Sequence, residues 1–162
     1  MWMLAGIGLI ATTLFGCHQT RFSTGTLPAD GEELPILHRI HGAHCLETRA
    51  MQIVVRDAAT LAQIPLADVP VDFRSEMLLI VTLGQVTSDQ YAVDITRVWR
   101  DRGMLRVETV VTAPPPGVPV VMASPFCIAV VPQCALNVAE FATKPPLRSR
   151  AWQQGEPPGS WK

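Results

Sequence analysis

Short apolar runs, each bounded by polar or turn-forming residues, divide the middle of the chain into strand-sized segments. The run Met77 to Leu83 is apolar and partly β-branched, stops at Gly84, and is too short for a typical helix. The run Phe126 to Val131 is apolar at both phases of a period-two pattern, as in strands buried on both faces. We expect these two runs to be the central strands of a small β domain.

Two further segments alternate between apolar and polar positions, which indicates strands with one solvated face. Tyr91 to Arg100 places Asp94 on its polar face, and Met104 to Val111 alternates in the same way. The short turn Asp101-Arg102-Gly103 separates them. The pattern therefore predicts an antiparallel hairpin.

Weaker signals precede the central runs. Ile36 to Ile40 and Met51 to Val55 are short strand candidates. Asp57 can cap a short helix over Ala58 to Ile64, where Ala, Leu and Gln favour a helix. The sequence thus predicts a mainly β fold: a single antiparallel β-sandwich-like domain of about seven strands with one short helix.

The N-terminal segment Met1 to Gly16 is an uninterrupted run of apolar and small residues that precedes Cys17. It is shorter than the roughly 20 residues that a helix needs to span a bilayer. The quartet Leu14-Phe15-Gly16-Cys17 resembles the end of a bacterial lipoprotein signal, in which the cysteine thiol takes a diacylglycerol group. We expect residues 1–16 to be a signal peptide and lipidated Cys17 to anchor the protein in the cell envelope. Because His18 is not the aspartate that retains many lipoproteins at the inner membrane, the outer membrane is favoured. A plain signal peptide or a short anchor is the alternative.

Composition changes at both ends of the predicted β domain. Residues 17–35 mix Thr, Ser, Gly, Pro and acidic residues without periodicity, which is typical of a flexible tether. Residues 143–162 are rich in proline and contain Trp152 and Trp161, which predicts a loose tail. The 162-residue chain is therefore read as one domain, residues 36–142, with appendages.

Charge and motifs exclude several classes of function. The net charge of −1 leaves no basic face for a nucleic acid. The sequence has no G-x-S-x-G, phosphate-binding loop, H-E-x-x-H or dinucleotide fingerprint. We predict a protein that is not an enzyme and holds no cofactor.

Three histidines stand close together, at His38, His41 and His44, with Cys45 next to them. Such residues could form a zinc or copper site. On a strand, however, His38 and His44 point to one face and His41 to the other. We therefore predict no stoichiometric metal, and a small-ligand or metal-binding lipoprotein remains the rival interpretation.

The remaining cysteines do not fix a disulfide pattern. Cys45, Cys127 and Cys134 are an odd number, which leaves at least one thiol free or intermolecular in an oxidising compartment. Cys127 and Cys134 could close a small loop, or Cys127 could be a free core thiol.

The order of motifs in the middle of the chain resembles a known family. A D-F pair, M-x-x-x-V-x-L-G, a polar turn ending in tyrosine, V-x-I, a proline and glycine loop and S-P-F follow one another, as in the C-terminal domain family of the protease-complex stability protein PrcB. The family's P-T-G-G-Y-like turn is replaced here by Thr87-Ser88-Asp89-Gln90-Tyr91, which lacks both glycines. The matching residues are Asp72, Phe73, Met77, Val81, Leu83, Gly84, Tyr91, Val93, Ile95, Pro116, Gly117, Ser124, Pro125 and Phe126.

This resemblance implies a non-catalytic protein-interaction domain that stabilises or anchors an exported protease or another complex. The proline-rich loop adds a physical reason, because a stiff exposed loop loses little entropy on binding a partner. A rigid connector is the alternative reading of that loop, and a protease inhibitor acting through loops at one end of the domain is an alternative function. The candidate contact residues are Thr87, Ser88, Asp89, Gln90, Tyr91, Pro114, Pro115, Pro116 and Gly117.

Overall fold

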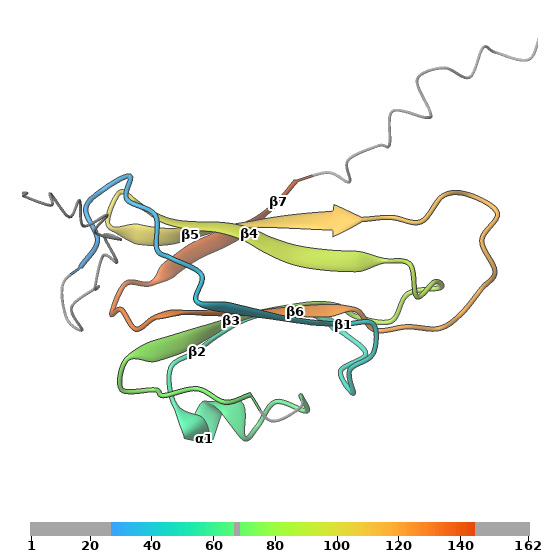
Figure 1. Cartoon of the computed structure of the whole chain (residues 1–162), viewed down its shortest axis with the longest axis horizontal. Coiled ribbons are helices and arrows are strands. Elements are labelled where there is room, and N and C mark those ends of the chain that lie inside the picture. Colours follow the sequence, from blue (N-terminus) through green and yellow to red (C-terminus); the bar gives the residue numbers. More distant parts are fainter. Residues whose placement is uncertain (1–26, 67–68, 145–162) are drawn as a thin grey trace, which may run out of the picture.

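The computed structural model describes residues 27–66 and 69–144, which form two stacked β-sheets (Figure 1). A four-stranded and a three-stranded sheet face each other, so the predicted β-sandwich-like fold is confirmed. The elements are β1 (His38–Gly42), β2 (Ala50–Val55), α1 (Ala58–Leu61), β3 (Glu76–Leu83), β4 (Ala92–Asp101), β5 (Met104–Thr112), β6 (Phe126–Pro132) and β7 (Val138–Lys144).

The four-stranded sheet has the order β1-β6-β3-β2, and all its pairs are antiparallel. The two runs expected to be central, β3 and β6, do lie in the middle. Almost all their residues are buried, because one face of the sheet packs on the second sheet and the other on the segment that contains α1. Apolar residues at both phases of the strand therefore have a place inside.

The three-stranded sheet has the order β4-β5-β7. Its β4–β5 hairpin turns at Arg102 and Gly103, which both have positive φ, 51° and 77°. Two such residues in a two-residue turn match the right-handed twist of the strands. The prediction of a wholly antiparallel sandwich is wrong at one pair, because β7 runs parallel to β5. After β5 the chain leaves the three-stranded sheet and runs back through β6 in the four-stranded sheet. It then returns to the three-stranded sheet as β7, which runs in the same direction as β5.

Apolar side chains fill both faces of the four-stranded sheet. Between the sheets lie Met77, Leu79 and Val131, against Val98 and Leu105 of the opposite sheet. A second cluster on the outer face includes Leu78, Ile80, Ile128 and Val130, with Leu61, Ile64 and Phe73 of the covering segment packed on it. The four-stranded sheet is thus the middle layer of the domain.

The structure shortens the predicted helix and the predicted tether. α1 ends at Leu61 rather than Ile64, while Asp57 caps it as expected by accepting a hydrogen bond from Thr60 N at 2.7 Å. Residues 28–35 belong to the folded domain and not to a flexible tether. Leu34 is buried in the core, and its backbone N–H donates to Val98 O at 2.9 Å.

β7 continues to Lys144, two residues beyond the predicted boundary of the domain. The predicted signal peptide (residues 1–16), Cys17 and the tail from residue 145 lie outside the described residues. Within residues 27–66 and 69–144, no helix is long and apolar enough to cross a membrane.

Candidate functional site

Three connections meet at one end of the sandwich, on the right in Figure 1. They are residues 43–49, 84–91 and 113–125, and we call this surface the loop end. Val86 and Ala123 exchange two backbone hydrogen bonds of 2.8 and 3.0 Å, and Val121 N donates to Thr87 O at 3.1 Å. Ser124 N donates to Ala43 O at 2.9 Å, which joins the third connection. The two connections that contain the predicted contact loops are therefore hydrogen-bonded to one another, through Val86 and Thr87 on one side and Val121 and Ala123 on the other.

The turn Thr87 to Tyr91 forms without the two glycines of the P-T-G-G-Y-like turn that it resembles. None of its five residues has a positive φ. Ser88 is buried and takes over the local hydrogen bonding: its hydroxyl accepts from Gln90 N at 3.2 Å, and its carbonyl accepts from Tyr91 N at 3.4 Å. Ser88 is therefore a structural residue rather than a contact residue. Asp89 and Gln90 are exposed and can reach a partner.

The proline-rich loop is only partly exposed. Pro116 and Gly117 form a turn in which Gly117 has a φ of 86°, the value that a type II turn requires after proline. Pro115 and Pro116 face solvent, whereas Pro114 is half-buried. Three prolines hold the backbone of this loop close to one conformation.

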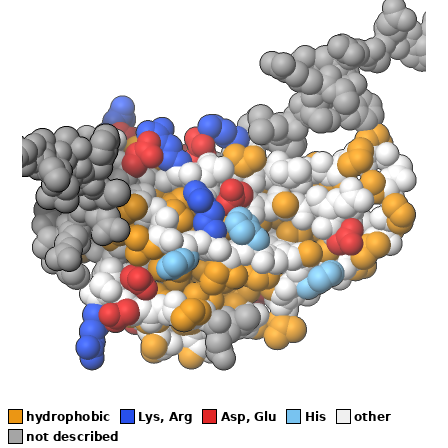
Figure 2. All heavy atoms as spheres, viewed as in Figure 1, with side chains coloured by type: hydrophobic (Ala, Val, Ile, Leu, Met, Phe, Trp, Pro, Cys, Tyr) orange, Lys and Arg blue, Asp and Glu red, His pale blue; other side chains and the backbone are white. Residues whose placement is uncertain are grey.

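The most apolar part of the loop end lies outside the contact residues predicted from the sequence. Val120, Val121 and Met122 are exposed, with Val120 at 75% and Met122 at 51%. Hydrophobic side chains gather on this end of the molecule in Figure 2. The proline in the V-P-V-V-M run could have indicated this exposure from the sequence. Pro119 disfavours the pairing of this run as a strand, which leaves its side chains outside the core.

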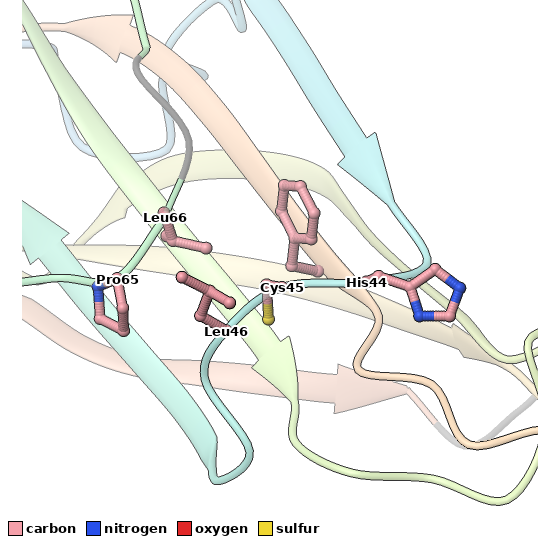
Figure 3. A pocket seen from close by; sticks show the side chains of 6 residues that line it. His44, Cys45, Leu46, Pro65 and Leu66 are labelled. Atoms are coloured by element: carbon pink, nitrogen blue, oxygen red, sulfur yellow. The ribbon is translucent and has the colours of Figure 1, made fainter.

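A shallow apolar depression of about 370 Å³ adjoins the loop end on the outer face of the four-stranded sheet. Figure 3 shows Leu46 and Leu66 facing one another across it, while the ring of His44 points away. Leu46 is 82% exposed, the highest value among the large apolar residues described. The remaining lining residues are Cys45, Pro65 and Phe126.

The three histidines considered from the sequence do not come together as one group of possible metal ligands. Among the described residues, neither His38 nor His44 belongs to such a group. His41 instead lies beside Asp94 and Cys127, and one donor atom of each lies within 4.8 Å of the others. Cys127 Sγ donates a weak hydrogen bond to Asp94 Oδ1 at 3.7 Å, and His41 Nε2 is 3.8 Å from the same oxygen. Arg39 Nε is 3.6 Å from it.

This Cys-His-Asp set does not favour nucleophilic catalysis. Burial raises the pKa of the Cys127 thiol to about 12, whereas a nucleophilic cysteine needs a lowered pKa. The carboxylate of Asp94 contacts the thiol directly and further disfavours the thiolate. Cys45, Cys127 and Cys134 are all free thiols, so the 127–134 disulfide is not formed here.

No protein-family model, no characterised protein and no solved structure was found to match this chain.

Proposed function

We propose that the chain is a non-catalytic lipoprotein of the bacterial cell envelope whose loop end binds an exported protein. The observation that carries this proposal is the loop end itself. Two connections distant in sequence, residues 84–91 and 113–125, are joined by backbone hydrogen bonds, and the second presents the exposed apolar side chains of Val120, Val121 and Met122. The motif order resembling the PrcB C-terminal family suggests a protease as the partner, which the domain stabilises or holds at the membrane.

The physical properties of the loop end suit a binding surface. Exposed valine and methionine side chains lose water-accessible apolar area when a partner covers them, which favours association. The prolines and the hydrogen bonds between the connections restrict the loop before binding, so little further conformational entropy is lost. Asp89 and Gln90 supply polar groups at the edge of the apolar surface, as in the rims of known interfaces.

Site-specific photo-crosslinking in cells tests the proposal. A photoreactive residue at Val120 should form an adduct with an exported protein, and the same residue at Met104 should not. Met104 is 39% exposed and lies at the opposite end of the sandwich, in the β4–β5 turn region. Met122→Ser should then reduce the adduct at Val120, whereas Met104→Ser should leave it unchanged. Equal adducts at both ends, or none at Val120, would contradict the proposal.

The identity and fate of the captured protein distinguish the alternatives. If it is a protease whose cellular level falls when Met122 is changed to Ser, the stabilising role holds. If the purified chain slows that protease, the inhibitor reading is favoured instead.

The anchor is tested separately, because it does not depend on the loop end. Cys17→Ser should move the chain from detergent-extracted membranes to the soluble fraction and abolish the mobility shift caused by lipid. A variant that stays in the membrane without a mobility shift would show that the lipoprotein reading is wrong.

A further inference from the structure

Three side chains with different metal-binding atoms meet at one open edge of the sandwich. His41 comes from β1, an edge strand, and its register partner on β6 is Cys127. Asp94 comes from β4, an edge strand of the opposite sheet. The cluster thus bridges the two sheets where neither edge is covered by another strand.

We propose that His41, Asp94 and Cys127 bind one zinc ion. Zinc binds sulfur at about 2.3 Å and nitrogen or oxygen at about 2.0–2.2 Å, so donors of a tetrahedral site lie about 3.3–3.7 Å apart. The observed separations are 3.7 Å from Cys127 Sγ to Asp94 Oδ1 and 3.8 Å from His41 Nε2 to the same oxygen. Small side-chain rotations would bring these two pairs to the spacing of a zinc site.

The donor set selects the kind of metal. A thiolate, an imidazole and a carboxylate together suit zinc, whereas calcium and magnesium require oxygen ligands throughout. Three protein ligands leave the fourth tetrahedral position open to water. The exposed side of His41 gives an ion access from solvent, while fully buried Cys127 closes the inner side.

The charges around the cluster are compatible with a bound ion. Zinc replaces the proton of the Cys127 thiol, which leaves to solvent, and the resulting thiolate with Asp94 balances the two charges of the ion. Arg39 is the neighbouring cation, and its Nε is 3.6 Å from Asp94 Oδ1. The same nitrogen also donates to Ile95 O at 2.9 Å, so the guanidinium keeps a partner when the carboxylate turns to the metal.

The spacing of the histidines in the sequence could not have predicted this site. Strand alternation does place His38 on the other face of β1 from His41, whereas His44 lies beyond the strand, in the connection of residues 43–49. The partners of His41 come from other strands, and Cys127 lies 33 residues beyond Asp94 in the chain. The prediction that the domain binds no stoichiometric metal rested on the histidine spacing alone, and the proposed zinc site departs from it.

Cobalt(II) titration of the full, untagged chain tests the site, because cobalt bound to a thiolate gives a ligand-to-metal charge-transfer band. We expect one equivalent of cobalt to produce this band and one equivalent of zinc to abolish it. The band should persist when Cys17, Cys45 and Cys134 are all changed to Ser, and it should disappear with Cys127→Ser. Wild-type protein that shows no band, or a band lost in the triple variant, would overturn the proposal.

A second variant protects the test from misfolding, because Cys127 is buried and its replacement can disturb the core. His41 is exposed, so His41→Ala should retain the circular dichroism spectrum. It should weaken zinc binding at least about tenfold, because even the loss of a group that only supports a ligand typically costs about 10–100-fold in metal affinity. His38→Ala, on the other face of the same strand, is the matched control and should bind zinc as the wild type does. Equal affinities of the His41→Ala and His38→Ala variants would refute the zinc site.

Discussion

Gly84 provides the sharpest test of how the four-stranded sheet closes. It follows β3, has a φ of 69°, and lies against the chain that enters β2. A Cβ atom there would be 2.6 Å from Ala50 N and 2.9 Å from Thr48 O. These are backbone atoms, so no side chain can rotate away, and the Gln85 N to Thr48 O hydrogen bond of 2.9 Å would have to lengthen.

The expected cost of Gly84→Ala has three parts. A left-handed conformation costs a residue with a Cβ about 1–2 kcal/mol. Forcing extra volume into a packed site costs about 1–3 kcal/mol. The lower entropy of the unfolded chain returns about 0.4–1 kcal/mol. The free energy of unfolding should therefore fall by roughly 1–5 kcal/mol, the sum of these ranges.

Gly103→Ala is the matched control, because Gly103 has a φ of 77° but no atom within 4 Å of an added Cβ. It carries the conformational cost without the steric one. Urea unfolding followed by far-ultraviolet circular dichroism should therefore show the Gly84 variant less stable than the Gly103 variant by about 1–3 kcal/mol. Equal unfolding midpoints with equal slopes would refute the close backbone approach at Gly84.

Three further changes test the core, a buried hydroxyl and a carboxylate. Ile128→Ala should lower the free energy of unfolding by about 2–5 kcal/mol, because Ile128 is buried, whereas changing exposed Pro116 to Ala should alter it far less; thermal melts compare the two. Thr82→Val should cost about 1–3 kcal/mol in urea titrations, because the buried hydroxyl accepts from a β2 N–H at 3.0 Å and donates to Arg49 O at 2.9 Å. Hydrogen bonds from Arg49 lower the pKa of Glu47 in the folded protein. Ionised Glu47 therefore contributes fully to the free energy of unfolding above the ordinary carboxyl pKa, and this contribution is lost as the pH falls through the lowered pKa. The Glu47→Gln variant should therefore lose less stability than the wild type as the pH falls through that acidic range. An equal loss of stability in the two proteins would contradict this.

The elements that could be predicted from the sequence are those whose own apolar pattern indicates how they are buried. β3 and β6 are apolar at both phases because both faces of their sheet are covered. β7 was not recognised, because its V-A-E-F-A-T-K sequence is half-exposed at an edge and alternates weakly. The parallel pairing of β7 with β5 follows from the way the chain crosses between the two sheets. A local residue pattern cannot predict such a crossing.

The candidate surfaces were predicted only in part for the same reason. The proline-rich loop and the turn before Tyr91 could be recognised from their residue types, but the hydrogen bonds between the connections that contain them depend on how β3 and β6 pair. The cluster of His41, Asp94 and Cys127 requires both the β1–β6 register and the stacking of the sheets. Neither can be read from residue spacing.

The Arg102-Gly103 turn also has a consequence for the order of folding. The β4–β5 hairpin joins strands separated by two residues, whereas β1 must wait for β6, and β7 can join β5 only after β6 has crossed between the sheets. Local pairings close cheaply, and distant ones carry a larger loop-closure entropy. The hairpin is therefore the natural starting point of folding, and a chain emerging from its N-terminus must expose the edge of β3 that pairs with β6 until β6 arrives.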